Sequence, residues 1–177
     1  PHRIARLGIS RAFQVSSIFA KMSVAENVRS AVHAQMRRSF SIFGAASRIG
    51  VDEADRVLVL CGLEGKRDLI AGELAQGDKK RLELAIALAG KPRLLFLDEP
   101  TAGMSIDEAR STMELVDRLN RELGLTVLFT EHDMGIVFNH ARKLTLMHRG
   151  EIVVQGTPEE VRANETAQKV YLGEHQA

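Results

Sequence analysis

The sequence predicts an α/β fold built on a parallel sheet, and three observations lead to that fold class. Between residues 94 and 140, short apolar segments alternate with longer amphipathic ones in the order strand, helix, strand, helix. This alternation is typical of a parallel sheet with crossover helices. The chain has 177 residues, 45% of them hydrophobic and 27% charged, which suffices for one domain with a sizeable core. No apolar stretch approaches the ~20 residues that a membrane-spanning helix needs.

The first ninety residues predict mainly helix. Three segments have apolar residues at helical spacing between capping or breaking residues: 24–36, 52–61 and 78–89. Ser23 and Glu26 have the spacing of a capping box at the start of the first segment. Residues 37–50 lack a sustained period and predict a loop or a short helical turn.

The second half of the chain predicts the alternating elements. They are two strands, each followed by a helix: 94–97 then 107–123, and 126–130 then 134–140. Residues 143–148 and 151–154, joined by Arg149 and Gly150, predict a β-hairpin. Thr157, followed by proline and two glutamates, predicts the start of a short helix.

Two adjacent acids, Asp98 and Glu99, follow the apolar residues 94–97. Such a strand is expected to be buried on both faces, where an unpaired carboxylate is costly, so the acids are expected at its end. Ligands of open α/β sheets bind outside the carboxyl ends of the strands. Because neighbouring strand residues point opposite ways, one acid can hold Mg²⁺ and the other can orient or deprotonate a water. The alternative makes Asp98 a turn or cap residue and Glu99 a solvated acid.

The strand at residues 126–130 ends in a polar segment that contains His132. If the two strands are neighbours, this segment lies beside the acids. A histidine there can donate a hydrogen bond to a phosphate oxygen. The alternative is an ordinary surface histidine next to a helix cap.

Residues 74–78 lead directly into a predicted helix. Ala75 and Gly77 are small, so backbone N–H groups at the helix start can approach an anion, which the helix dipole also favours. Asp78 opposes an anion unless its side chain points away. The alternative is a common glycine at a helix start.

These segments, in this order, resemble the nucleotide-binding domain of ABC transporters. Residues 74–78 resemble the signature motif, residues 94–99 the Walker B motif with its catalytic glutamate, and residues 102–107 the D-loop. His132 resembles the switch histidine, and residues 11–14 resemble the Q-loop. The resemblance covers essentially the whole chain.

The resemblance implies that the protein binds ATP and Mg²⁺ and hydrolyses ATP. The implied catalytic residues are Glu99, which acts on the attacking water, and His132, which stabilises the γ-phosphate. Asp98 is implied to position Mg²⁺, and Gln14 to contact the metal and report the nucleotide state. Three further cofactor-binding residues would face the nucleotide held by an opposite copy: Ala75, Gln76 and Gly77.

The implied fold is a P-loop NTPase sheet with flanking helices and a helical subdomain. Residues 1–14 would begin the core remnant at the Q-loop, residues 15–90 would form the helical subdomain with the signature helix, and residues 91–177 the RecA-like core remnant. The implied partners are a second nucleotide-binding subunit in a head-to-tail dimer, transmembrane permease subunits and, indirectly, a solute-binding protein. Such partners imply a peripheral position on the cytoplasmic face of the cell membrane.

Four segments narrow the resemblance to the ATPases of branched-chain amino acid importers: residues 4–14, 102–104, 150–158 and 170–174. ATPases of lipid export and urea import share much of this pattern. A soluble ABC-type ATPase of translation or DNA repair is another alternative, because residues 1–50 hold eight Lys or Arg against one acid. No nucleic acid is expected as a partner, since the chain has no added nucleic-acid module. An inert remnant of the fold is the last alternative.

The chain departs from the family pattern in two ways. First, the chain does not contain the P-loop motif, in which a glycine and four further residues precede Gly-Lys-Ser/Thr. The resemblance places that loop before Pro1. We therefore expect a chain truncated before the Q-loop, without the Walker A strand-loop-helix. Such a chain is expected to leave an edge of the strand at residues 94–97 exposed. It is also expected not to hydrolyse ATP alone. Second, the usual serine of the signature motif is Ala75 here, which removes a hydroxyl and predicts reduced activity.

Cys61 is the only cysteine, and its apolar neighbours predict a buried thiol rather than a reactive one. The formal net charge of +1 argues neither for nor against an acidic partner.

Overall fold

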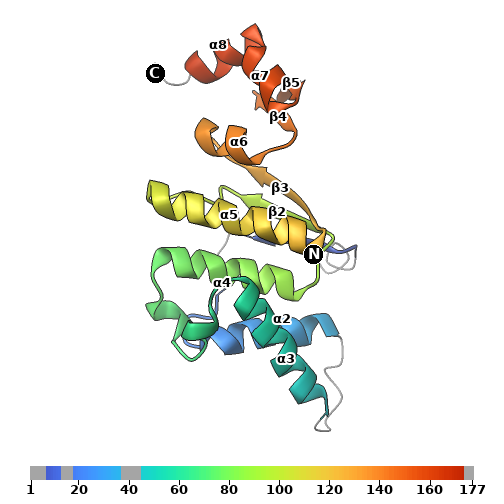
Figure 1. The fold of residues 1–177 in the computed structure, drawn as a ribbon, viewed down its shortest axis with the longest axis vertical. Helices are drawn as coiled ribbons and strands as arrows, with labels where there is room; N and C mark the ends of the chain where they lie inside the picture. Colours follow the sequence, from blue (N-terminus) through green and yellow to red (C-terminus); the bar gives the residue numbers. More distant parts are fainter. Residues whose placement is uncertain (1–6, 13–17, 37–44, 174–177) are drawn as a thin grey trace. The chain divides into compact units, whose positions relative to one another are not determined.

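The computed structural model of the protein describes residues 7–12, 18–36 and 45–173 (Figure 1). They belong to two compact units, Pro1–Thr130 and Glu131–Ala177. In these described ranges, no helix combines the length and the apolar character needed to cross a membrane.

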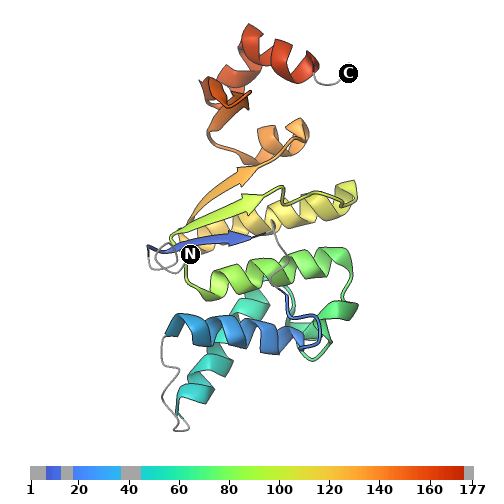
Figure 2. The ribbon, with the colours of Figure 1, turned by 180° about the vertical axis from the view of Figure 1, so that it is seen from behind.

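The first unit contains a three-stranded parallel sheet in the order β1, β2, β3 (Figure 2). The strands are β1 (Ile9–Ala12), β2 (Leu94–Asp98) and β3 (Thr126–Thr130). The predicted parallel sheet is confirmed, and β2 and β3 lie where they were expected. Leu95 and Leu97 of β2 are fully buried, whereas Leu94 and Phe96 on the other face are only partly buried. The expected burial of this strand therefore holds completely for one face.

The expectation of an exposed edge on the strand at residues 94–97 is wrong, because β1 pairs with one edge of β2 and β3 with the other. β1 is short and contains polar Ser10 and charged Arg11, so its sequence carries little strand signal. Arg11 pairs with Phe96 in the sheet register, and its guanidinium carbon lies 5.3 Å from the centroid of that ring. This cation–π contact covers apolar surface that the partly buried face of β2 leaves open.

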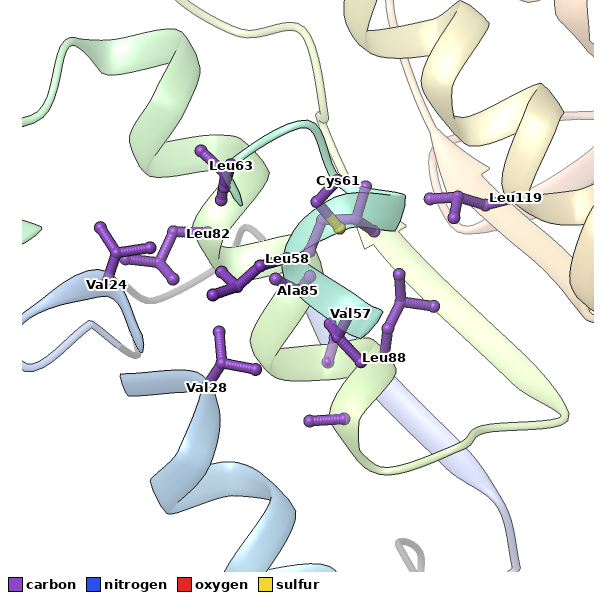
Figure 3. Close-up of a cluster of buried hydrophobic side chains, with 14 of the residues drawn as sticks. Val24, Val28, Val57, Leu58, Cys61, Leu63, Leu82, Ala85, Leu88 and Leu119 are labelled. Atoms are coloured by element: carbon purple, nitrogen blue, oxygen red, sulfur yellow. The ribbon is translucent and has the colours of Figure 1, made fainter. Parts of the chain in front are cut away.

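Three helices of the first unit share one hydrophobic core: α2 (Val24–Met36), α3 (Ala45–Leu60) and α4 (Gln76–Ala89). Figure 3 shows their buried side chains in one cluster, which includes Leu119 of α5 (Ile106–Leu123). Cys61 lies in this cluster, and burial raises the pKa of its thiol to about 12. The predicted burial of the thiol is confirmed, and the raised pKa disfavours the reactive thiolate. Helix α4 also packs against β1, so the same core fixes α4 to the sheet.

Helix α3 begins at Ala45, whereas the sequence predicted a loop or turn up to residue 50. The prediction was wrong because Ser47 and Gly50, which have lower helix propensity than alanine, hide the helical period at the start of α3. In the structure Gly50 is buried, and a Cβ atom there would lie 3.0 Å from the imidazole of His33 on α2. The glycine permits the close approach of α2 and α3 instead of ending a helix. The rest of the predicted loop, residues 37–44, lies outside the described residues.

The second unit contains the predicted hairpin, β4 (Leu144–His148) and β5 (Glu151–Gly156). Its turn residues Arg149 and Gly150 both have positive φ, 51° and 84°, as two-residue hairpin turns require. The described helices of this unit are α6 (Met134–His140), α7 (Pro158–Ala163) and α8 (Glu165–Gly173). Thr157 caps α7 as predicted, while α8 was not predicted from the sequence.

Leu58→Ala is expected to lower the free energy of unfolding by about 2–5 kcal/mol, because it leaves a cavity among α2, α3 and α4. Val59→Ala is the matched control on the same helix. Val59 is 58% exposed, and its truncation is expected to change the free energy of unfolding by less than about 0.5 kcal/mol. Urea denaturation followed by circular dichroism measures both values. Equal effects of the two substitutions would contradict this core.

Candidate functional site

Asp98 is the last residue of β2, and both neighbouring strands donate hydrogen bonds to its carboxylate. Arg11 of β1 donates through Nη2 to Oδ2 at 2.9 Å, and Thr130 of β3 donates through Oγ1 to Oδ1 at 2.6 Å. The Asp98 side chain is 27% exposed. The carboxylate is therefore held by one cationic and one neutral donor while it stays open to solvent.

These donors lower the pKa of the Asp98 carboxyl below its ordinary value of 3.8. The hydrogen bond from Thr130 is the largest cause, and the hydrogen bond from Arg11 comes next. Partial desolvation opposes the shift, and the positive charge of Arg11 adds to it. Asp98 is thus ionised at neutral pH and can serve as an anionic oxygen ligand.

Glu99 lies on the turn that leaves β2, and its side chain is exposed. Its φ is 48°, an uncommon value for a residue with a Cβ atom and one that often marks functional sites. The Glu99 N–H donates to the Thr130 carbonyl oxygen at 3.1 Å and lies 3.3 Å from the Thr130 hydroxyl oxygen. The expectation that both acids lie at the strand's end is confirmed. β3 fixes the backbone on which Glu99 stands.

The segment after the acids forms a fixed turn that leads into α5. Ser105 caps α5 in a capping box: its hydroxyl accepts from the Glu108 N–H at 3.4 Å, and the Glu108 carboxylate accepts from the Ser105 N–H at 2.9 Å. The Ser105 hydroxyl also donates to the Glu108 carboxylate at 2.8 Å, and the two hydrogen bonds that Ser105 donates lower the pKa of the Glu108 carboxyl. Thr101, earlier in the turn, is only 8% exposed.

Helix α4 begins without a side-chain cap. Its N-cap residue is Ala75, and both Ala75 and Gln76 are exposed. Because the first N–H groups of a helix have no partner within the helix, this end is electropositive and suits an anion. Gly77 presents no side chain, and a Cβ atom there would lie 3.6 Å from Oε1 of Glu108. The starts of α4 and α5 therefore lie side by side.

Asp78 is the acid that would oppose an anion at the start of α4. The structure pairs its carboxylate with the ammonium group of Lys66. Both residues line a hollow between the starts of α4 and α5, together with Gly77, Arg81 and Glu108. The charge of Asp78 is therefore compensated by a residue that comes from outside the helix.

Two predicted site residues do not belong to the described part of the first unit. Gln14 lies outside the described residues. His132 belongs to the second unit, is exposed, and donates from its backbone N–H to Oε2 of Glu131 at 3.2 Å. It directly precedes Asp133, whose carboxylate caps α6 by accepting from two backbone N–H groups.

Asp98 fits a Mg²⁺ ion bound through a single protein carboxylate. Mg²⁺ prefers oxygen ligands, and in nucleotide sites one or two carboxylates hold it together with water and phosphate oxygens. The Asp98 carboxylate is ionised and partly exposed. Over the ranges that the structure describes, no group of three or more His, Cys, Asp or Glu could hold a metal ion. Asp98 thus suits the part of one ligand among several oxygens.

Three contacts of this site were not predicted: those of Arg11, Thr130 and Lys66. The first two depend on the register of β2 with its neighbours, which no local pattern specifies. The polar character of Thr130 at the end of strand 126–130 could nevertheless have indicated a hydrogen-bond donor near the acids. Lys66 lies 12 positions before Asp78 at the end of a short 3₁₀ turn, and no pattern in the sequence links the two residues.

Comparisons with known proteins add independent findings. Residues 1–102 match a family model described as ABC transporter, and residues 151–177 match one described as Branched-chain amino acid ATP-binding cassette transporter. The high-affinity branched-chain amino acid transport ATP-binding protein LivG of Salmonella typhimurium is 36% identical, over 97% of this chain and 70% of the relative. BraF of Pseudomonas aeruginosa, of the same description, is 34% identical over 98% and 71%. The methionine import ATP-binding protein MetN of Streptomyces griseus is 35% identical over 91% and 43%.

Solved structures of ABC transporter proteins share the fold of this chain. The ADP conformation of MJ1267, an ATP-binding cassette of an ABC transporter, matches with a TM-score of 0.80 and 27% identity, over 98% of this chain and 71% of that one. The cbiO1 protein of Clostridium perfringens, part of the ABC transporter complex cbiONQ, matches with a TM-score of 0.77 and 28% identity, over 96% and 66%.

Thr130→Val is expected to raise the pKa of the Asp98 carboxyl toward 3.8, because it removes the hydrogen bond that lowers this pKa most. A pKa depressed by folding stabilises the folded state above the ordinary pKa, and this contribution is lost as the pH falls through the folded value. The variant is therefore expected to lose less stability than the parent on acidification below 3.8.

Carbon-13 NMR titration of the side-chain carboxyls measures these pKa values. Glu26 is the control, because Ser23 lowers its pKa at the start of α2, away from β2 and β3. An unchanged pKa of Asp98 in the variant, or an equal change at Glu26, would refute the described hydrogen bond.

Proposed function

The chain belongs to the ABC transporter family, and we propose that it is the subunit that binds and hydrolyses ATP to drive uptake of branched-chain amino acids. The family predicted from the motifs is confirmed, and so is the α/β fold of the ABC ATPases. One observation carries the proposed activity. An ionised Asp98, held by Thr130, ends β2 directly before Glu99 on a positive-φ turn.

In this proposal Asp98 is the protein ligand of Mg²⁺. Its carboxylate is already fixed by hydrogen bonds from β1 and β3, so little side-chain freedom is lost when it binds an ion. A Mg²⁺ ion bound there with ATP would withdraw charge from the phosphate oxygens. Gln14 is proposed, by resemblance alone, as a second contact to the metal and as the reporter of nucleotide state.

Glu99 is proposed to orient and deprotonate the attacking water. Its exposed carboxylate stands one residue beyond Asp98, on a backbone that Thr130 holds in place. A carboxylate positioned in this way typically accelerates proton transfer by about 10²–10⁴-fold. His132 is proposed to donate a hydrogen bond to the γ-phosphate.

The start of α4 is proposed to contact the nucleotide held by an opposite, head-to-tail copy of the subunit. The uncapped N–H groups and the missing side chain at Gly77 allow close approach of a phosphate oxygen. Ala75 and Gln76 are exposed beside them. Since Ala75 has no hydroxyl, backbone groups carry more of this contact than in the usual signature motif.

We assign residues 15–90 to the helical subdomain and residues 1–14 and 91–177 to the nucleotide-binding core. The shared hydrophobic core of α2, α3 and α4 supports the first assignment. The proposed partners are permease subunits at the cytoplasmic face of the membrane, through which a solute-binding protein would act. The match of residues 151–177 to the branched-chain amino acid family supports the proposed substrate class.

Glu99→Gln, in the protein assembled with its permease, is expected to lower ATP hydrolysis by about 10²–10⁴-fold and to leave ATP binding within about twofold, because it removes a base and keeps the shape of the side chain. A phosphate-release assay and a titration with a fluorescent ATP analogue measure the two quantities. Glu122→Gln, at an exposed position of α5, is the matched control and should change neither. An equal loss of binding and hydrolysis would assign Glu99 a structural role.

The substrate class is tested in proteoliposomes that contain the protein, its permease and the solute-binding protein. Leucine, isoleucine and valine are expected to stimulate ATP hydrolysis several-fold, whereas methionine is not. Methionine is the informative competitor, because the percentage identity of this chain to MetN of Streptomyces griseus, 35%, is close to the 36% to LivG. Stimulation by methionine alone would overturn the proposed substrate.

A further inference from the structure

Asp78 is an acid in the first turn of α4, at the place proposed to receive a triphosphate. An acid in the first turn stabilises the helix through its dipole, but it also repels an arriving anion. Asp78 is well covered, with 18% of its side chain exposed, so solvent screens its charge only in part. The site therefore contains a charge of the wrong sign for its proposed ligand.

Lys66 supplies the compensating charge. Its ammonium group donates a hydrogen bond to Oδ2 of Asp78 in a salt bridge. The bridge joins two segments, because Lys66 ends the short 3₁₀ turn Glu64–Lys66 that precedes α4 in the chain.

The backbone holds the turn of Lys66 firmly. Its N–H donates to the carbonyl of Leu63 at 2.9 Å, and Leu63 is fully buried in the core. The next residue, Arg67, pairs with Asp55 of α3 at 3.2 Å, and its carbonyl accepts from the Ala25 N–H at 2.9 Å. Lys66 is thus presented to Asp78 from an anchored segment, which reduces the entropy lost when the ion pair forms.

The other charges that line the same hollow have partners of their own. Arg81 donates to the hydroxyl of Ser111 at 2.8 Å. Asp107 lies 3.9 Å from Arg110, and Glu108 belongs to the capping box of α5. Compensation of Asp78 therefore falls to Lys66 within this cluster.

We propose that Lys66 is a positioning residue that neutralises Asp78, so that the start of α4 can accept the triphosphate of the opposite subunit. This inference rests on the proposed function, since it needs a nucleotide at the interface of two copies. A purely structural role of the ion pair, a tether between the turn and α4, predicts a different pattern of effects. A tether is lost equally when either partner is neutralised. Charge compensation is lost only when Lys66 is removed and Asp78 remains.

The test uses the full-length ATP-binding protein with Glu99→Gln as the parent, because this substitution is expected to retain ATP and so to stabilise the ATP-bound dimer. Lys66→Met, Asp78→Asn and the double variant are compared with it by sedimentation at saturating MgATP. Lys66→Met is expected to weaken ATP-dependent dimerisation about tenfold, because the uncompensated charge of Asp78 would repel the triphosphate. Asp78→Asn is expected to leave dimerisation unchanged or stronger, and the double variant to return within about threefold of the parent. The defect of Lys66→Met is expected to shrink in 1 M KCl, where the Debye length is about 3 Å.

The outcomes are separable. If Lys66→Met and Asp78→Asn weaken the dimer equally, or if Lys66→Met has no effect, the inference fails while the proposed function stands. If the parent itself does not dimerise with ATP, the proposed function and the inference both fail. Thermal unfolding of each variant identifies a folding defect, and Asp78→Asn, with Lys66 intact, still distinguishes the two roles by its direction.

Discussion

The parallel register of β2 with its two neighbours is the constraint on which the candidate site depends. It sets Asp98 opposite Thr130, and it places Arg11 beside Phe96 within reach of the same carboxylate. The donors lie 87 and 32 positions from Asp98 in the chain, so only the sheet brings the three together. A slip of one residue in either neighbour would turn its donor to the opposite face and leave the acid without that partner. The sheet register thus determines both the position and the ionisation of Asp98.

A second constraint acts through the core beneath α4. Leu82 and Leu88 bury one side of this helix against α2 and α3, which leaves its first turn at the surface. Two polar contacts then tie neighbouring helices to α5. Arg81 of α4 donates to Ser111 at 2.8 Å, and Arg118 of α5 donates to the carbonyl of Leu60 at 2.9 Å. The segments that resemble the signature motif and the D-loop are therefore anchored to one another before any ligand is considered.

The sequence predicted those features that local chemistry determines. The two acids were placed correctly at the end of β2, because a buried strand does not tolerate an unpaired carboxylate. β1 was missed, because Ser10 and Arg11 leave it without an apolar pattern and only pairing with β2 makes it a strand. The start of α3 was missed for a related reason. Gly50 has meaning only beside His33, and that neighbour is set by the packing of two helices. Long-range partners of this kind are absent from any local window.

Asp98 and Asp78, two of the acids that the site would bring near a nucleotide, each carry a cationic partner, but the two pairs differ physically. Asp98 has a second donor in Thr130, and Arg11 has a second contact in the ring of Phe96. Arg11 can therefore withdraw when another cation binds Asp98, and neither group is left without a contact. Asp78 is less exposed than Asp98, and its described ion pair is with Lys66 alone. Withdrawal of Lys66 would leave a poorly solvated carboxylate at a helix start that is meant to face phosphate. The ion pair at the end of β2 can thus exchange its cation, whereas the ion pair at the start of α4 must persist.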